Sequence, residues 1–192
     1  SISVIHKMKG HYLDTKHPII MENLHGIKRT LGSRQIAKKP ILINELKLII
    51  NVIDEIKIKD KDLVEAKVKS SDVKRDKALI LLGFAGGFRR SELVNIEHED
   101  IEFVQEGVKI VIKRSKTDQS GEGTIKAIPY FDNEKYCPVK ALKNYMTYGF
   151  AIANKGKIFD ISDKSVALII KRYAEKAGLD SSKYAGHSLR SG

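Results

Sequence analysis

Apolar residues recur at intervals of three and four in the first half of the chain, which is the spacing of one buried helix face. A first helix is predicted to begin at an Asn44 cap and to run to Ile56. After a charged loop, 57–69, a second helix is expected from Ser71-Asp72 to Gly86-Gly87. Because positions 78–82 are all apolar, that second helix is predicted to be buried on most sides.

The C-terminal part repeats this helical pattern after a short helix expected at 91–96. Pro138 suits the first position of a helix that we expect to reach Phe150. Ser162 can cap a further helix, and Gly178 can end it. Its predicted inward positions are Val166, Ile169, Ile170, Tyr173 and Ala177.

The pattern changes to alternation between residues 101 and 130, which indicates strands. Strand signals cover 101–104, 108–112 and 124–130, and a turn signal lies at 120–123. These segments predict a β-hairpin or a small antiparallel sheet. The fold class is therefore α+β and mostly helical.

Two short amphipathic patterns, 2–8 and 18–31, precede these elements. Neither is long enough to be a stable helix alone, so we interpret them as the end of an all-helical module. The basic stretch that follows suits a linker that crosses a nucleic-acid backbone, and it equally suits a plain solvated linker. The predicted domains are 1–33 (helical module), 34–41 (linker) and 42–192 (main domain).

Charge narrows the class of partner. Lys and Arg number 35 against 24 Asp and Glu, a net charge of +11, which favours an extended polyanion over an acidic small molecule. A solvated basic surface is the alternative. The single cysteine, Cys137, has no second thiol for a disulfide or a metal and fits a reducing cytoplasm. No apolar run approaches the roughly 18 residues that span a bilayer, so we expect no membrane partner.

One pair of residues suggests phosphate chemistry. His187 and Arg190, three residues apart, share a helix face, and an imidazole beside a guanidinium suits a single phosphate group. A surface helix end gives the same spacing. Arg89 precedes Glu92 by the same interval, and that pair taken alone favours a local salt bridge.

Three motifs in order resemble the tyrosine recombinase (phage integrase) family. They are Arg75-Asp76-Lys77-Ala78-Leu79 with Gly87-Phe88-Arg89-Arg90-Ser91-Glu92-Leu93, then Ser115-Lys116-Thr117-Asp118-Gln119, then Gly186-His187-Ser188-Leu189-Arg190. The resemblance covers residues 42–192 as an integrase-type catalytic domain, and 1–33 resembles the end of the helical core-binding domain. It implies a site-specific recombinase that cleaves and rejoins DNA strands through a 3′-phosphotyrosine intermediate.

The resemblance also implies a role for each residue. Arg89 and Arg190 would hold the scissile phosphate, with Glu92 orienting Arg89, and two guanidiniums can do so without a metal or cofactor. Lys116 would protonate the leaving 5′ oxygen. His187 would donate to a phosphate oxygen or accept the nucleophile's proton, and both roles stay open.

The family's nucleophilic tyrosine follows the His-x-x-Arg motif, and no tyrosine follows Arg190 here. The chain also begins at Ser1 without a leader, so we interpret it as cut at both ends and expect these residues alone not to cleave DNA. The alternatives are a catalytically inactive DNA-binding module, or remnant of a recombinase, and a type IB topoisomerase.

Double-stranded DNA is the expected partner, with a homo-tetramer of the full-length protein on it and a cytoplasmic, nucleoid-associated location. Phosphate contacts with steep salt dependence are predicted from basic side chains along the chain. For the pair on the last predicted helix, an ordinary solvated face is the alternative. The candidates are Lys38, Lys39, Lys113, Arg114, Lys171 and Arg172.

Overall fold

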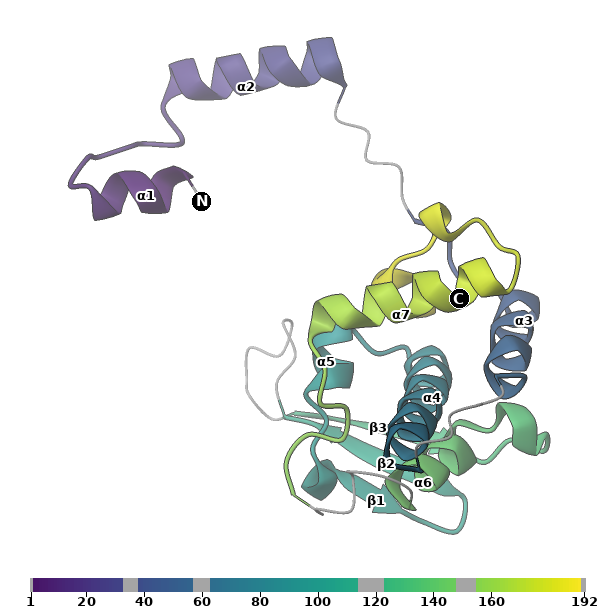
Figure 1. Ribbon diagram of the computed structural model, residues 1–192. Coiled ribbons are helices and arrows are strands. Elements are labelled where there is room, and N and C mark those ends of the chain that lie inside the picture. Colours follow the sequence, from purple (N-terminus) through teal and green to yellow (C-terminus); the bar gives the residue numbers. More distant parts are fainter. Residues whose placement is uncertain (1, 33–37, 57–62, 114–122, 148–154, 191–192) are drawn as a thin grey trace. The chain divides into compact units, whose positions relative to one another are not determined.

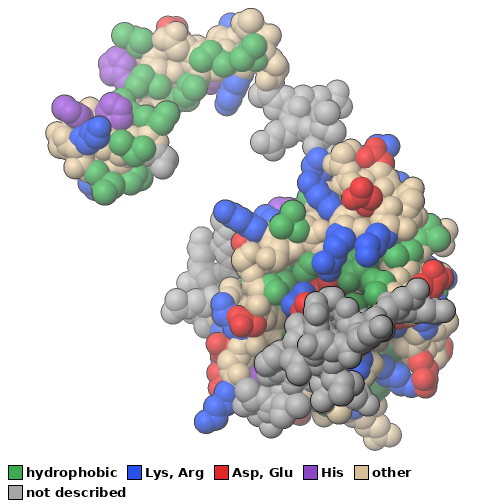
Figure 2. Space-filling model, viewed as in Figure 1, with side chains coloured by type: hydrophobic (Ala, Val, Ile, Leu, Met, Phe, Trp, Pro, Cys, Tyr) green, Lys and Arg blue, Asp and Glu red, His purple; other side chains and the backbone are tan. Residues whose placement is uncertain are grey.

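The computed structural model describes residues 2–32, 38–56, 63–113, 123–147 and 155–190, and the chain divides into two compact units, 1–37 and 38–192. The first unit contains α1 (Ile2–Met8) and α2 (Pro18–Leu31), with the bounds that the apolar pattern predicts. Both helices carry apolar side chains at the surface, shown in green in Figure 2. Neither helix buries a residue, so the described part of this unit has no core of its own.

The second unit is built on helices that surround α4. Its helices are α3 (Ile43–Asp54), α4 (Leu63–Ala85), α5 (Arg90–Val94), α6 (Pro138–Thr147) and α7 (Asp163–Lys176). α4 contacts α3, α5 and α6, while α7 packs on α3 and α5 (Figure 1). Short 3₁₀ turns complete the unit: η1 (His98–Asp100), η2 (Glu134–Tyr136), η4 (Ser181–Lys183) and η5 (Gly186–Leu189). The last two follow α7 and contact it.

The strand signals form one antiparallel sheet in the order β1 (Ile101–Phe103), β2 (Gly107–Ile112) and β3 (Thr124–Pro129). Val108, Ile110 and Ile112 point into the core, as their alternation predicts. Gly107 is required where β2 meets β3, because a Cβ atom there would lie 2.0 Å from the Ile128 carbonyl oxygen.

The core joins the helices to this sheet. Residues 78–82 of α4 are each no more than 2% exposed, which confirms that this helix is buried on most sides there. α7 begins at its predicted Ser162 cap, whose hydroxyl accepts the Ser165 N–H. No helix among the described residues is long and apolar enough to span a membrane.

Two predicted helix starts are wrong. α4 begins at Leu63 rather than at Ser71-Asp72, because residues 63–69 contain no Gly or Pro and have good helix propensity, so the helix continues through the cap signal. α3 is not capped by Asn44. Its capping position is Leu42, whose N–H donates to Glu45 Oε2 at 3.0 Å.

The linker boundary also differs from the prediction. The sequence pattern assigns residues 38–41 to the linker, but they belong to the second unit, and Ile41 is fully buried in its core. The rest of the predicted linker, 34–37, lies outside the described residues.

Candidate active site

Arg89 is held at the start of α5 by the side chain of Glu92. Glu92 Oε2 accepts a hydrogen bond from the Arg89 backbone N–H at 2.9 Å, and Glu92 Oε1 accepts one from Arg89 Nη1 at 2.6 Å. The Glu92 side chain is 7% exposed and that of Arg89 28%. Because hydrogen bonds between charged groups are strong, this one carboxylate orients both the backbone and the guanidinium of Arg89. The salt bridge that their spacing predicts is present.

The turn that presents Arg89 depends on two glycines and on a lysine from the sheet. Gly87 has a φ of 55°, in the left-handed region that favours glycine. A Cβ atom on Gly86 would lie 2.1 Å from the ring of Phe88. Lys126 Nζ donates to the Gly86 carbonyl at 2.6 Å and lies 4.9 Å from the centre of the Phe88 ring. Lys126 therefore links β3 of the sheet to the turn that precedes Arg89.

Lys126 is a residue that the sequence analysis missed. Its signal is its position in β3, where it shares a face with buried Ile128 and pairs with buried Ile110. A lysine at an inward position of a strand requires a polar partner, and the Gly86 carbonyl is that partner.

His187 and Arg190 lie one turn apart, in η5 and at its C-terminal cap. The predicted helix start is thus a 3₁₀ turn, which has three residues per turn and places these two residues above one another. Both are exposed, whereas Ser188 and Leu189 between them are buried. The pair therefore faces solvent on a short segment whose other side is anchored in the core.

Residues 38–41, which we call the strap, hold this segment through backbone hydrogen bonds. The Ile41 N–H donates to the Ser188 carbonyl at 2.9 Å, and the Lys39 N–H donates to the Lys183 carbonyl at 2.8 Å. Ser188 Oγ accepts the Ala185 N–H at 3.0 Å. Because Ile41 is itself buried, the strap ties the His187–Arg190 segment to the core.

Gly83 of α4 brings the two arginine-bearing segments together. A Cβ atom on Gly83 would lie 2.9 Å from Leu189 Cδ1 and 3.1 Å from Leu93 Cδ2. Leu93 lies in α5, which Arg89 precedes, and Leu189 directly precedes Arg190. Both leucines therefore pack on the same glycine, and Arg89 and the His187–Arg190 pair stand on adjoining elements.

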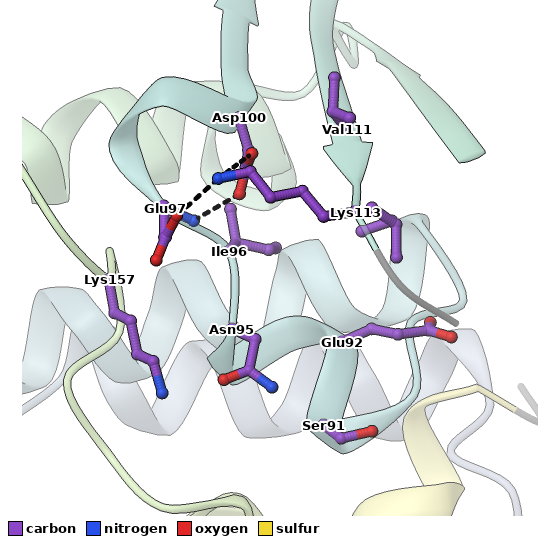
Figure 3. Close-up of a pocket in the computed structure, with 10 residues that line it drawn as sticks. Ser91, Glu92, Asn95, Ile96, Glu97, Asp100, Val111, Lys113 and Lys157 are labelled. Atoms are coloured by element: carbon purple, nitrogen blue, oxygen red, sulfur yellow. Dashed lines mark hydrogen bonds and ion pairs between the residues drawn. The ribbon is translucent and has the colours of Figure 1, made fainter. Parts of the chain in front are cut away.

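A hollow of about 340 Å³ lies between α5, η1 and the end of β2, with Glu92 on one side and Lys157 across from it, while Lys113 extends toward Glu97 and Asp100 (Figure 3). Lys113 Nζ contacts the carboxylates of Glu97 at 2.6 Å, Glu99 at 2.7 Å and Asp100 at 3.1 Å. These partners, Glu97 first, raise the pKa of Lys113. The candidate DNA contact Lys113 is thus already paired within the protein. The hollow is lined by Ser91, Glu92, Asn95, Ile96, Glu97, Asp100, Val111, Ile112, Lys113 and Lys157.

The candidate acid Lys116 and the DNA-contact candidate Arg114 lie outside the described residues, in the segment 114–122 between β2 and β3. The structure therefore does not place either of them relative to Arg89 or His187.

Arg172 of α7 is exposed, with 51% of its side chain accessible, and it also contacts α4. Its guanidinium pairs with Asp76 of α4, a carboxylate that is completely buried. Arg75 Nη2 contacts the same carboxylate at 2.9 Å, and the Tyr173 hydroxyl donates to it at 3.0 Å. Lys171 is half-buried. The Asp76 network therefore fastens α7 to α4.

Burial governs the titration of this network. It raises the pKa of the Asp76 carboxyl, with Arg75 and Arg172 acting in the opposite direction. Burial, together with the Asp76 charge, raises the pKa of Tyr173 to about 12. Tyr173 therefore stays a neutral hydrogen-bond donor over the physiological range.

The two strap lysines are also engaged. Lys38 Nζ donates to the Ser182 carbonyl at 2.7 Å, and Lys39 pairs with Glu45, which raises the pKa of Lys39. Blue Lys and Arg side chains nevertheless gather at the surface over α7 and the turns that follow it (Figure 2). These basic side chains thus lie over α7, which contacts the η5 turn that carries His187.

Residues 44–192, which contain Arg89, Glu92, His187 and Arg190, match the model of the phage integrase family. The chain belongs to the phage integrase family. The three motifs that carried the resemblance lie within the matched range, as do α3 to α7 and the sheet, apart from the first residue of α3.

The chain is also similar in sequence to individual recombinases. The chain is 41% identical to an integrase/recombinase XerD homologue of Selenomonas ruminantium, over 95% of this chain and 53% of the relative. It is 31% identical to tyrosine recombinase XerA of Pyrococcus horikoshii, over 68% of this chain and 45% of that protein. The chain therefore spans about half the length of these curated relatives.

Solved structures show the same fold. A XerA recombinase structure has a TM-score of 0.54 at 18% identity and covers 98% of this chain and 62% of that one. A XerH site-specific recombinase, bound to its difH substrate before cleavage, has a TM-score of 0.58 at 15% identity, covering 98% of this chain and 55% of that one.

Proposed function

We propose that the whole protein is a site-specific DNA recombinase that cleaves and rejoins strands through a 3′-phosphotyrosine intermediate. One observation carries the proposal: in a member of the phage integrase family, Arg89 and the His187–Arg190 pair lie on elements that meet at Gly83. Two planar guanidiniums on adjoining elements suit the two non-bridging oxygens of one phosphate.

The residues divide the chemistry of strand cleavage between them. Arg89 and Arg190 stabilise the charge that develops on the phosphate in the transition state, and Glu92 keeps Arg89 oriented before DNA binds. Lys116 protonates the leaving 5′ oxygen. His187 either donates to a phosphate oxygen or accepts the proton of the nucleophilic hydroxyl. None of these steps uses a metal or a cofactor.

Double-stranded DNA is the proposed substrate, bound by a homo-tetramer in the cytoplasm and at the nucleoid. The net charge of +11 and the basic surface over α7 support a polyanionic partner. The similar fold of a XerH recombinase in complex with its difH substrate supports the same partner. Lys38, Lys39, Lys113, Arg114, Lys171 and Arg172 remain the proposed phosphate contacts. On DNA binding, the candidates that already have a described protein partner would exchange that partner for a phosphate group or share their charge between the two.

A nicked suicide duplex tests the proposal with the whole protein. The duplex is first selected from a random library by binding, and cleavage then releases a short fragment and leaves a covalent adduct. We expect the wild type to form the adduct about 100-fold faster or more than Arg89→Ala, while both bind the duplex. Binding without any adduct from the wild type would contradict the enzymatic proposal and support a DNA-binding module.

For the 192 residues alone we predict duplex binding that weakens steeply between about 50 and 200 mM salt, values typical of such titrations, without strand cleavage. Fluorescence anisotropy of a labelled duplex measures the salt slope. Strand nicking by the purified 192 residues would overturn the second part of this prediction.

A further inference from the structure

Arg90 follows Arg89 directly, is the first residue of α5, and lies across a glycine of the His187–Arg190 segment. A Cβ atom on Gly186 would lie 1.8 Å from Arg90 Cδ, 2.5 Å from Arg90 Cγ and 2.9 Å from Arg90 Nε. Real Cβ atoms essentially never come within 3.0 Å of such neighbours. The stem of Arg90 therefore occupies the space that any side chain at position 186 would need.

Space, and not backbone conformation, is what favours glycine at this position, because a larger residue would have to displace the Arg90 side chain. Gly186 is not among the glycines with positive φ, so its backbone is open to other residues. Gly186 is buried, and the closest atoms around its missing Cβ all belong to Arg90. Gly186 and Arg90 thus form one packing unit.

This contact lies next to both halves of the proposed phosphate site. Arg89 is the residue before Arg90, and His187 is the residue after Gly186. Gly83 supplies the other contact between the same segments, through Leu93 and Leu189. The η5 turn is therefore packed against the Arg89 region at two points, one aliphatic pair in the core and one arginine stem at the surface.

We propose that Arg90 is a positioning residue, whose aliphatic stem, packed across Gly186, sets the placement of His187 and Arg190 relative to Arg89. The inference rests on the proposed recombinase function. The two nearest atoms, Cδ and Cγ, belong to the aliphatic stem, and the third, Nε, begins the guanidinium, so the stem makes the closest contacts. An arginine can pack its stem in this way while its charged end stays in water. A displacement of about 1 Å between groups that hold one phosphate costs on the order of 100-fold in rate.

The stem and the charge are separated by comparing two variants of the whole protein on the selected suicide duplex. Arg90→Met keeps an unbranched stem and removes the charge, whereas Arg90→Ala removes both. We expect the single-turnover cleavage rate of Arg90→Ala to fall by about 10- to 100-fold, and that of Arg90→Met to stay within about threefold of wild type. The Kd for the duplex, measured separately, should change much less than the rate in Arg90→Ala.

A double-mutant cycle with Gly186 tests the contact itself. Gly186→Ala should lower the cleavage rate about as much as Arg90→Ala, because the new Cβ displaces the Arg90 stem. In the Arg90→Ala background the same Gly186→Ala change should have less than about a twofold effect, because the obstructing stem is gone. Lys135→Met, which removes a lysine from η2, is the matched surface control and should cleave at the wild-type rate. Thermal unfolding of each variant confirms that it is folded at the assay temperature.

Each result has one meaning. Equal losses in Arg90→Met and Arg90→Ala, or additive losses in the cycle, would overturn the positioning role while wild-type cleavage upheld the proposed function. Absence of any adduct from the wild type would overturn the proposed function, and the role of Arg90 in cleavage with it.

Discussion

Arg89 and Arg190 are presented to the same proposed phosphate by opposite means. Arg89 is oriented by a side chain, since both oxygens of buried Glu92 accept hydrogen bonds from it. Arg190 lies at the end of η5, which is positioned by its backbone, through the Ile41–Ser188 hydrogen bond and the burial of Leu189. The difference teaches that one half of the site is organised locally, within a few residues, and the other depends on a segment far away in the chain.

Alanine at each arginine separates catalysis from stability. We expect Arg89→Ala and Arg190→Ala each to slow cleavage by the whole protein about 100-fold or more, because a lost transition-state donor costs on the order of 3 kcal/mol. Only Arg89→Ala should also lower the free energy of unfolding, by about 1–3 kcal/mol, because it leaves the Glu92 carboxylate buried without this partner. Single-turnover cleavage and urea unfolding measure the two effects.

The control for this pair is Lys135→Ala, which removes the same charge from η2 and should change neither quantity. If both arginine variants lost the same stability, the contrast between side-chain and backbone positioning would be wrong.

Alkaline pH should destabilise α7, which contacts both α5, the helix after Arg89, and η5, the turn before Arg190. The pKa of Tyr173 is raised from 10 to about 12 in the folded protein, so its stabilising contribution is complete below pH 10 and is lost as the pH rises from 10 to 12. The shift corresponds to at most about 3 kcal/mol. Urea unfolding at pH 9, 10 and 11 should show a steeper decline for wild type than for Tyr173→Phe. Parallel declines would rule out this linkage.

A methyl group at Gly83 should separate the two segments at their junction. We expect Gly83→Ala to lower the free energy of unfolding by about 1–3 kcal/mol, because its Cβ would press on Leu93 and Leu189. Gly26→Ala is the matched control, because Gly26 is also a helical glycine but a Cβ atom there would meet no described neighbour within 4 Å. It should be neutral or stabilising by up to about 1 kcal/mol. Equal destabilisation by both changes would show that Gly83 is not a packing site.

The smallest expected effect on stability concerns Lys126, which contacts the turn before Arg89. Lys126→Met keeps the stem over Phe88 but removes the bond to the Gly86 carbonyl, so we expect a loss of about 1 kcal/mol in unfolding free energy. Lys109→Met, at an exposed position of β2, should cost less than about 0.5 kcal/mol. The comparison fails if the exposed lysine costs as much as the inward one.

Local pattern predicted the elements well where the signal was periodic. The bounds of α1 and α2, the Ser162 cap of α7 and the buried run 78–82 all follow from spacing and cap chemistry. The start of α4 did not, because a cap signal does not end a helix that good helix formers continue.

Charge was harder to interpret than periodicity. Lys113, Lys39 and Arg172 are basic residues that the sequence assigned to DNA, yet each has a carboxylate partner in the fold. Asp76 lies nearly a hundred positions from Arg172, so nothing local to α7 indicates that pair. An ion pair depends on which elements pack together, and spacing along one helix does not reveal that.

By itself the sequence determined where most helices and strands lie, though not every helix start, together with the three motifs and the local Arg89–Glu92 pair, because these depend on neighbours a few residues apart. Tertiary structure alone decided that Leu93 and Leu189 meet at Gly83, that the strap holds Ser188, and that Arg90 fills the space above Gly186. These contacts join residues that are far apart in the chain. They depend on how the helices and the sheet pack into one close-packed core, which no local sequence pattern specifies.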